Sequence, residues 1–340
     1  MKMKNAFTIF KNTYSTCLLI FSIVIIMGLV FNSETQLSSD VHPVLAFFLI
    51  WGAILWLSMV EGGQGALVGL TPINRDMYSD THPTTYKCTE IAYKGDNLDR
   101  YLLGRQFMVV LLVFVINLSG APLPGAELWG FPTALTNMFL VTGVAMILFT
   151  AMVGQLMSQV NAAHCMLDYL NNHSALITIW VALAIEFSGL LHASYLMQML
   201  VAKVSGHTIE SLESPRTRMQ NIFFWSRCFM SVTILGLCFA VTLEALFQGK
   251  TTMWDGVPNA VSVFLFFLLM SVVGLLEGMQ IAFFAVAKVC KSDRGDNPIA
   301  FKTCELLFKG QGLNLPGFMI GRQLCVVACF FIIARVTTIN

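Results

Sequence analysis

Long apolar runs separated by short polar stretches dominate this sequence. Each run approaches the roughly 20 residues that an α-helix needs to cross a bilayer. The pattern predicts eight transmembrane helices, near 15–32, 44–63, 104–120, 133–157, 174–200, 222–247, 258–284 and 317–337. The longest polar stretches are 70–103, 201–221 and 285–316. The fold class expected from this pattern is an all-α polytopic membrane protein.

Several positions recur along the chain at a nearly constant spacing. Offsets of 215 to 217 residues join four pairs: Pro43 and Pro258, Glu61 and Glu277, Glu90 and Glu305, Gly104 and Gly321. The segment YKCTEIAYKG at 86–95 also aligns with FKTCELLFKG at 301–310. Matches of this length in one register indicate two homologous repeats.

The duplication predicts two domains, 1–210 and 211–340. The first repeat has five predicted spans and the second only three, so we interpret the second as truncated in a partial sequence. An odd number of spans gives the second copy inverted topology, as in many secondary transporters. Lys and Arg counts agree with inversion up to residue 132. They disagree at 201–221 and 285–316, which are basic, so a parallel arrangement stays open unless these residues fold back onto the protein.

Composition supports the membrane assignment and narrows the partners. Hydrophobic residues make up 56% of the chain and charged residues 11%, whereas soluble domains carry about 25% charged residues. A net charge of +1 argues against nucleic acid as a partner. The nine cysteines show no paired spacing, which favours small buried hydrophobes over a disulfide framework.

The repeated polar positions form one constellation in each copy. Glu61 and Gln64 lie three residues apart and share a helix face, and a GRQ segment follows 43 residues later. The predicted binding residues are Glu61, Gln64, Arg105 and Gln106 in the first copy and Glu277, Gln280, Arg322 and Gln323 in the second. The glycines Gly62, Gly104, Gly278 and Gly321 accompany them. Such glycines either unwind a span or allow helices to pack closely.

This set of side chains is nearly neutral and rich in both donors and acceptors. It suits an uncharged polyhydroxyl solute, because each dehydrated hydroxyl needs a donor and an acceptor. Gln64 and Gln280 are expected to contact the solute hydroxyls. The carboxylates are expected to contact the solute or a coupling ion, held by the arginines. Membrane voltage does no work on a neutral solute, so accumulation requires a coupled ion, for which Na⁺ is expected.

The remaining motifs give little support for metal or enzyme chemistry. The segment NAAHCMLDYLNNH at 161–173 contains His164, Cys165, Asp168 and His173, of which Cys165 and Asp168 are the metal-ligand candidates. Their spacing is loose, and a solvated helix end is the simpler interpretation. Signatures of soluble enzymes such as Walker A, G-x-S-x-G and H-E-x-x-H are absent from the sequence. No enzyme activity and no cofactor are predicted.

The paired motifs resemble those of the diatom silicon transporters. EGGQ and GRQ at 61–106 and EGMQ and GRQ at 277–323 match that family's pattern, and CMLD at 165–168 is similar to a tetrapeptide once proposed there to bind zinc. The resemblance implies Na⁺-coupled symport of silicic acid by alternating access, in the plasma membrane or an internal membrane. It also implies about ten spans in two five-span halves, usually followed by further spans and a tail.

Two other functions remain open at this point. A passive channel for small neutral hydroxylated solutes would conduct them without accumulation. A membrane structural or receptor protein would use the glycine faces for dimerisation, and the sequence leaves a homo-oligomer open.

Overall fold

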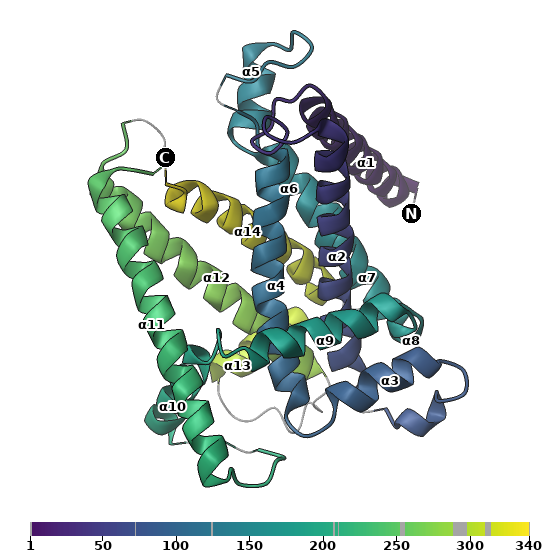
Figure 1. Ribbon diagram of the computed structural model, residues 1–340. Helices are drawn as coiled ribbons and strands as arrows, with labels where there is room; N and C mark the ends of the chain where they lie inside the picture. The colour runs from purple at the N-terminus through teal and green to yellow at the C-terminus, as the bar shows by residue number, and fades with distance from the viewer. Residues whose placement is uncertain are drawn as a thin grey trace. The chain divides into compact units, whose positions relative to one another are not determined.

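The chain folds into helices joined by short connections (Figure 1). The computed structural model describes residues 2–71, 73–123, 125–206, 208–209, 211–251, 256–287, 298–309 and 314–339, and these residues form no strand. The α-helices are α1 Lys2–Phe31, α2 Pro43–Leu70, α3 Pro83–Ala92, α4 Asn97–Gly120, α5 Thr133–Thr136, α6 Val144–Phe149, α7 Met157–His164, α8 Met166–Leu170, α9 His173–Phe187, α10 Ala193–Ser205, α11 Arg218–Gln248, α12 Asn259–Ala287, α13 Pro298–Leu307 and α14 Asn314–Thr337. A 3₁₀ turn, η1, spans Arg75–Met77, and π-helical turns η2 and η3 span Asn137–Val141 and Thr150–Leu156.

Seven helical segments among the described residues are long and apolar enough to cross a membrane. They are Ile9–Phe31, Pro43–Leu70, Asn97–Gly120, Val144–His164, Arg218–Gln248, Asn259–Phe283 and Gly317–Thr337. This confirms the predicted class, and the protein is an all-α, multi-pass membrane protein.

The polar stretches contain short helices that the apolar pattern did not predict. Helix α3 follows the long helix α2, and α13 follows the long helix α12. Both short helices have 10 residues and begin at a proline, whose fixed φ suits the first helical turn. Helices α2 and α12 have 28 and 29 residues, and α4 and α14 have 24 each. A long, short, long order of matched lengths therefore occurs twice.

The predicted fifth span, 174–200, is not one continuous helix. Helix α9 ends at Phe187, and α10 begins at Ala193 after a turn in which Gly189 has φ of +87°. That φ favours glycine, because a Cβ there is strained. With 15 residues, α9 is only about 22 Å long, which is shorter than the roughly 30 Å hydrocarbon core. The five-span count of the first repeat, and the inverted topology that rested on this odd count, stay predictions.

The predicted fourth span, 133–157, is also interrupted. Gly143 lies between η2 and α6 with φ of +74°, and η3 joins α6 to α7 with π-helical geometry. The long apolar segment runs instead over Val144–His164. Short π-helical turns within α-helices often occur at functional positions.

The chain divides into two compact units, each built from separate stretches of sequence. One unit contains 1–58, 112–158 and 267–334, and the other contains 59–111, 159–266 and 335–340. The predicted domain boundary at 210/211 rests on a duplication in the sequence. The division into compact units does not test whether the sequence is duplicated. It stays a prediction.

Aromatic pairs join helices in the first unit, whose buried side chains are mostly aliphatic. Helix α1 packs against α6, and Phe21 meets Phe139 edge to face at 5.0 Å. Trp51 on α2 contacts the fully buried Phe149 in the same geometry at 5.3 Å. Edge-to-face pairs of this kind contribute about 1 kcal/mol beyond their burial.

Hydrogen bonds between elements organise the second unit. Helix α3 packs against both α8 and α9 (Figure 1). The hydroxyl of Thr85 on α3 donates to the Leu167 carbonyl at 2.7 Å. The hydroxyl of Tyr93, just after α3, donates to the Leu67 carbonyl near the end of α2 at 2.6 Å. The polar stretch 70–103 thus folds against the helices.

The structure describes the basic residues of the two predicted loops, 201–221 and 285–316, to different extents. Arg216 in the predicted loop 201–221 lies over the ring of Phe224, 3.9 Å from its centroid, so this residue folds back onto α11. Lys288, Lys291 and Arg294 of the predicted loop 285–316 lie outside the described residues.

The buried His192 in the α9–α10 turn gives the protein an acid-sensitive stability. This residue lies outside the seven candidate spans, and its pKa is lowered to about 4 by burial, with further repulsion from Arg227, Arg216 and Arg100. An unfolded chain has the ordinary value of 6.5. Between pH 6.5 and 4, the unfolded chain therefore binds the proton and the folded chain does not, so stability falls as the pH falls.

When the pH is lowered from 7 to 5, we expect the free energy of unfolding of the wild-type protein to fall by on the order of 2 kcal/mol more than that of the His192→Gln variant. Denaturation of both proteins in detergent at the two pH values measures this difference. An equal loss in the two proteins would contradict the assignment.

Candidate functional site

The first repeated motif lies on a continuous helix. Glu61 and Gln64 are on α2, and their exposed fractions are only 2% and 1%. The glycines around them do not unwind the span, because α2 is helical from Pro43 to Leu70. Of the two uses that the sequence allowed for these glycines, close packing is the one seen.

Arg105 on α4 ties the two motifs of the first repeat together. Its Nη2 donates to Glu61 Oε2 at 2.8 Å, and its Nη1 donates to Gln106 Oε1 at 2.8 Å. Arg105 is itself only 2% exposed. The pairing of Arg105 with Glu61 that the sequence predicted is present, and the three side chains form a Glu–Arg–Gln chain of polar contacts.

The second repeat forms the same chain of contacts. Arg322 Nη1 donates to Glu277 Oε1 at 3.1 Å, and Arg322 Nη2 donates to Gln323 Oε1. The side chain of Arg322 is buried, whereas that of Glu277 is 19% exposed. The second carboxylate is therefore more accessible than the first.

A buried pair of opposite charges is costly to remove from water, and breaking it leaves an uncompensated charge. Each pair here adds one positive and one negative charge, so each half-site stays neutral. Neutrality favours a neutral ligand over an ion as the main occupant. We call the first group, Glu61, Gln64, Arg105 and Gln106, the first half-site, and the second group, Glu277, Gln280, Arg322 and Gln323, the second half-site.

Both half-sites leave the same two kinds of buried atom without a hydrogen-bond partner among the described residues. The acceptors are Gln64 Oε1 and Gln280 Oε1, and the donors are Arg105 Nε and Arg322 Nε. Gln280 and Arg322 are 2% and 3% exposed. Buried polar atoms nearly always have partners, so each exception needs an explanation. A ligand hydroxyl, which both donates and accepts, satisfies both kinds of atom.

Gln159 on α7 is a site residue that sequence reasoning missed. Its Nε2 donates to Glu61 Oε2 at 3.0 Å, the oxygen that also accepts from Arg105. The available signal was an amide just after the predicted span 133–157. That signal is weak, because Asn137 and Gln155 in the same stretch are also amides and the spacing does not distinguish Gln159 from them.

The glycines differ in surroundings between the two repeats. A Cβ on Gly62 would overlap the ring of Tyr169, and one on Gly69 would meet Met166 at 2.5 Å. A Cβ on Gly104 would overlap the backbone carbonyl of Ala182 on α9. Among the described residues, nothing lies within 4 Å of a Cβ on Gly278 or Gly321. The glycines of the first repeat are therefore packing positions.

The metal-ligand candidates that the sequence suggested, Cys165 and Asp168, have contacts different from those of the half-site residues. Cys165 is exposed and precedes α8. Asp168 is 78% exposed, and its Oδ1 lies 3.2 Å from His82 Nε2. The described part of the chain gathers no group of three His, Cys, Asp or Glu suited to a metal ion. Met166 and Tyr169 of this segment instead cover the glycines of α2.

The half-sites belong to different compact units. Glu61, Arg105 and Gln159 lie in the unit containing 59–111, and Glu277 and Arg322 lie in the unit containing 267–334. Convergence of the two half-sites on one ligand stays a prediction.

The packing of Gly104 gives a matched pair of substitutions. Gly104→Ala is expected to destabilise the protein by about 2 kcal/mol or more, because backbone cannot move aside as a flexible side chain can. Gly321→Ala, at the equivalent position of the second GRQ, is expected to be neutral. Denaturation of purified protein in detergent measures both changes, and equal effects at the two positions would contradict the packing role.

No curated protein and no solved structure matches the chain. The family model described as silicon transporter matches residues 3–340, which is nearly the whole chain and includes both half-sites. The chain therefore belongs to the silicon transporter family, which makes it a membrane transporter of silicon compounds.

Proposed function

We propose that the protein is a Na⁺-coupled symporter of silicic acid that works by alternating access. The observation that carries the proposal is the matched pair of unpartnered atoms in each half-site, Gln64 Oε1 with Arg105 Nε and Gln280 Oε1 with Arg322 Nε. Silicic acid is neutral and presents only hydroxyls, each of which donates and accepts one or more hydrogen bonds. A neutral site with buried donors and acceptors in both copies suits such a solute.

The residues then have distinct roles. Gln64 and Gln280 accept from solute hydroxyls, and the Nε–H groups of Arg105 and Arg322 donate to them. Glu61 and Glu277 hold the arginines in place and keep each half-site neutral. Of the two carboxylates, Glu277 is the better candidate for contact with the solute or Na⁺, because its side chain is 19% exposed.

The matched lengths of α2, α3 and α4 and of α12, α13 and α14 support an internal duplication as the basis of this site. In the proposal, the repeats have inverted topology and their half-sites face one solute near the middle of the membrane, the usual position in such transporters. The proposed location is the plasma membrane, with an internal membrane as the alternative.

Removing the acceptors tests the solute site. Gln64→Leu and Gln280→Leu are each expected to lower uptake of silicic acid, or of its germanic analogue, about tenfold or more in proteoliposomes. One lost hydrogen bond to a buried group costs 1 kcal/mol or more, which corresponds to a change of that order. Gln198→Leu, an exposed glutamine on α10, is the matched control. Unchanged uptake in both half-site variants would reject the assignment.

An imposed gradient tests the coupling ion. Proteoliposomes with an inward Na⁺ gradient are expected to accumulate the solute above its external concentration, and the accumulation should collapse when a Na⁺ ionophore is added. A K⁺ gradient of equal size is the control. Flux that reaches only equilibrium under every gradient would indicate a passive channel and overturn symport.

A further inference from the structure

The turn between α9 and α10 is a second place where polar groups gather in an otherwise apolar stretch. The backbone of this turn is irregular, so its carbonyls and amides need partners outside the helices. Three side chains of α11 supply them. Ser231 Oγ donates to the Leu190 carbonyl at 2.6 Å and accepts from the Ala193 amide at 2.9 Å. Cys228 Sγ contacts the His192 carbonyl at 3.7 Å.

Arg227 completes this support from α11. Its Nη1 donates to the Phe187 carbonyl at 3.0 Å, at the last residue of α9. Its guanidinium also lies over the rings of Phe223 and Phe187, 4.4 Å and 5.4 Å from their centroids. Because α11 satisfies the broken backbone, the polar side chains of the turn itself remain available for other contacts.

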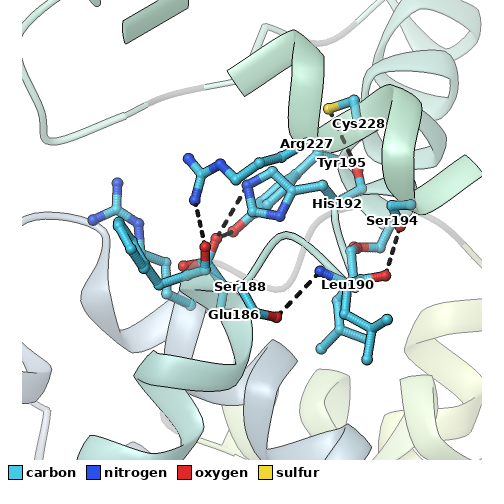
Figure 2. A network of polar contacts seen from close by, with 12 residues as sticks. Glu186, Ser188, Leu190, His192, Ser194, Tyr195, Arg227 and Cys228 are labelled. Carbon is cyan, nitrogen blue, oxygen red and sulfur yellow. Dashed lines mark hydrogen bonds and ion pairs between the residues drawn. The ribbon is translucent and has the colours of Figure 1, made fainter. Parts of the chain in front are cut away.

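Those side chains form a buried cluster. Tyr195 donates its hydroxyl hydrogen to Glu186 Oε1 at 2.9 Å, and His192 Nε2 lies 3.7 Å from the same oxygen. Glu186 and His192 are 6% and 1% exposed. Figure 2 shows these side chains together with Arg227 at the turn. Ionisable residues inside apolar segments of membrane proteins usually mark functional sites.

This cluster leaves one buried acceptor and one buried donor without a partner among the described residues. The acceptor is His192 Nδ1 and the donor is Arg227 Nε. Figure 2 shows these two side chains close together at the turn. Each half-site has the same combination, one unpartnered acceptor and one unpartnered arginine Nε.

The cluster lies about one helical turn from the first GRQ motif. Helix α4 touches α9 backbone to backbone where Gly104 meets Ala182. Glu186 is four residues after Ala182, and Arg100 is four residues before Gly104, so each lies one turn from this contact. The two helices thus connect the cluster to Arg105 within one compact unit.

We propose that the α9–α10 turn is a second binding site for the transported neutral hydroxylated solute, with His192 Nδ1 as hydrogen-bond acceptor and Arg227 Nε–H as donor. The inference rests on the proposed function, because it takes the solute to be neutral and hydroxylated. Charged ligands fit poorly, since His192 lies near both the Glu186 carboxylate and the Arg227 guanidinium, so both signs of charge are already present.

Nitrogen NMR of the histidine side chains tests the site in the wild-type protein. Protein carrying ¹⁵N-histidine is titrated with germanic acid in nanodiscs, and His192→Gln assigns the His192 signals. The Nδ1 resonance of His192 is expected to shift and saturate as it accepts a hydrogen bond. His82, which pairs with Asp168 outside the cluster, is the internal control and should not shift.

A second arm separates this inference from the proposed function. In the double variant Gln64→Leu/Gln280→Leu, transport should be lost while the His192 shift persists. In single variants, His192→Leu should raise the KM for uptake about tenfold, and His192→Gln, which keeps an acceptor oxygen, should restore much of the loss.

The outcomes are distinct. If wild type transports and the half-site variants fail, but His192 never shifts, the second site is wrong and the proposed function stands. If germanic acid neither binds nor is transported by wild type, the proposed function fails and this inference fails with it.

Discussion

The polar architecture of this protein depends on one interaction, the ion pair between a glutamate and an arginine buried inside apolar helices. A single charge at that depth is costly, so each carboxylate requires its guanidinium. The requirement fixes which face of α2 meets α4 in one unit and which face of α12 meets α14 in the other. It also orients each arginine, so that one Nη contacts the carboxylate, the other contacts the neighbouring glutamine, and Nε is left over.

The two copies keep this interaction while their surroundings differ. In the first copy, Gln159 adds a third partner to Glu61, and α8 and α9 cover the glycines at Gly62 and Gly104. In the second copy, Glu277 is more exposed and Gly321 has open space around it within the described residues. The part that the two copies share is thus the charge pair with its amide, and among the described residues the packing around it differs between the copies.

The sequence predicted what depends on regular spacing and on duplication. The helical class followed from the apolar runs, and the Glu61–Arg105 pair followed from two motifs that recur together. The break at Gly189 was missed because hydropathy measures composition and is blind to a residue with positive φ. Gln159 was missed because its contact depends on how α7 approaches α2, which no local pattern encodes. Met166 lies within the CMLD segment that suggested a metal site and Tyr169 directly follows it, yet both side chains pack against glycines of α2.

Helix α4 also has a mechanical consequence. Just before its first turn, Asp96 accepts hydrogen bonds from Ser211 and from the Leu212 amide, and Arg100 pairs with Glu213 at 2.8 Å. The Ser211 bond lowers the pKa of Asp96, so this attachment remains charged at neutral pH. An α-helix is stiff along its axis, and Arg105 lies about 7.5 Å further along than Arg100. The segment between α10 and α11 is therefore attached to the start of α4, the same helix that carries the guanidinium holding Glu61.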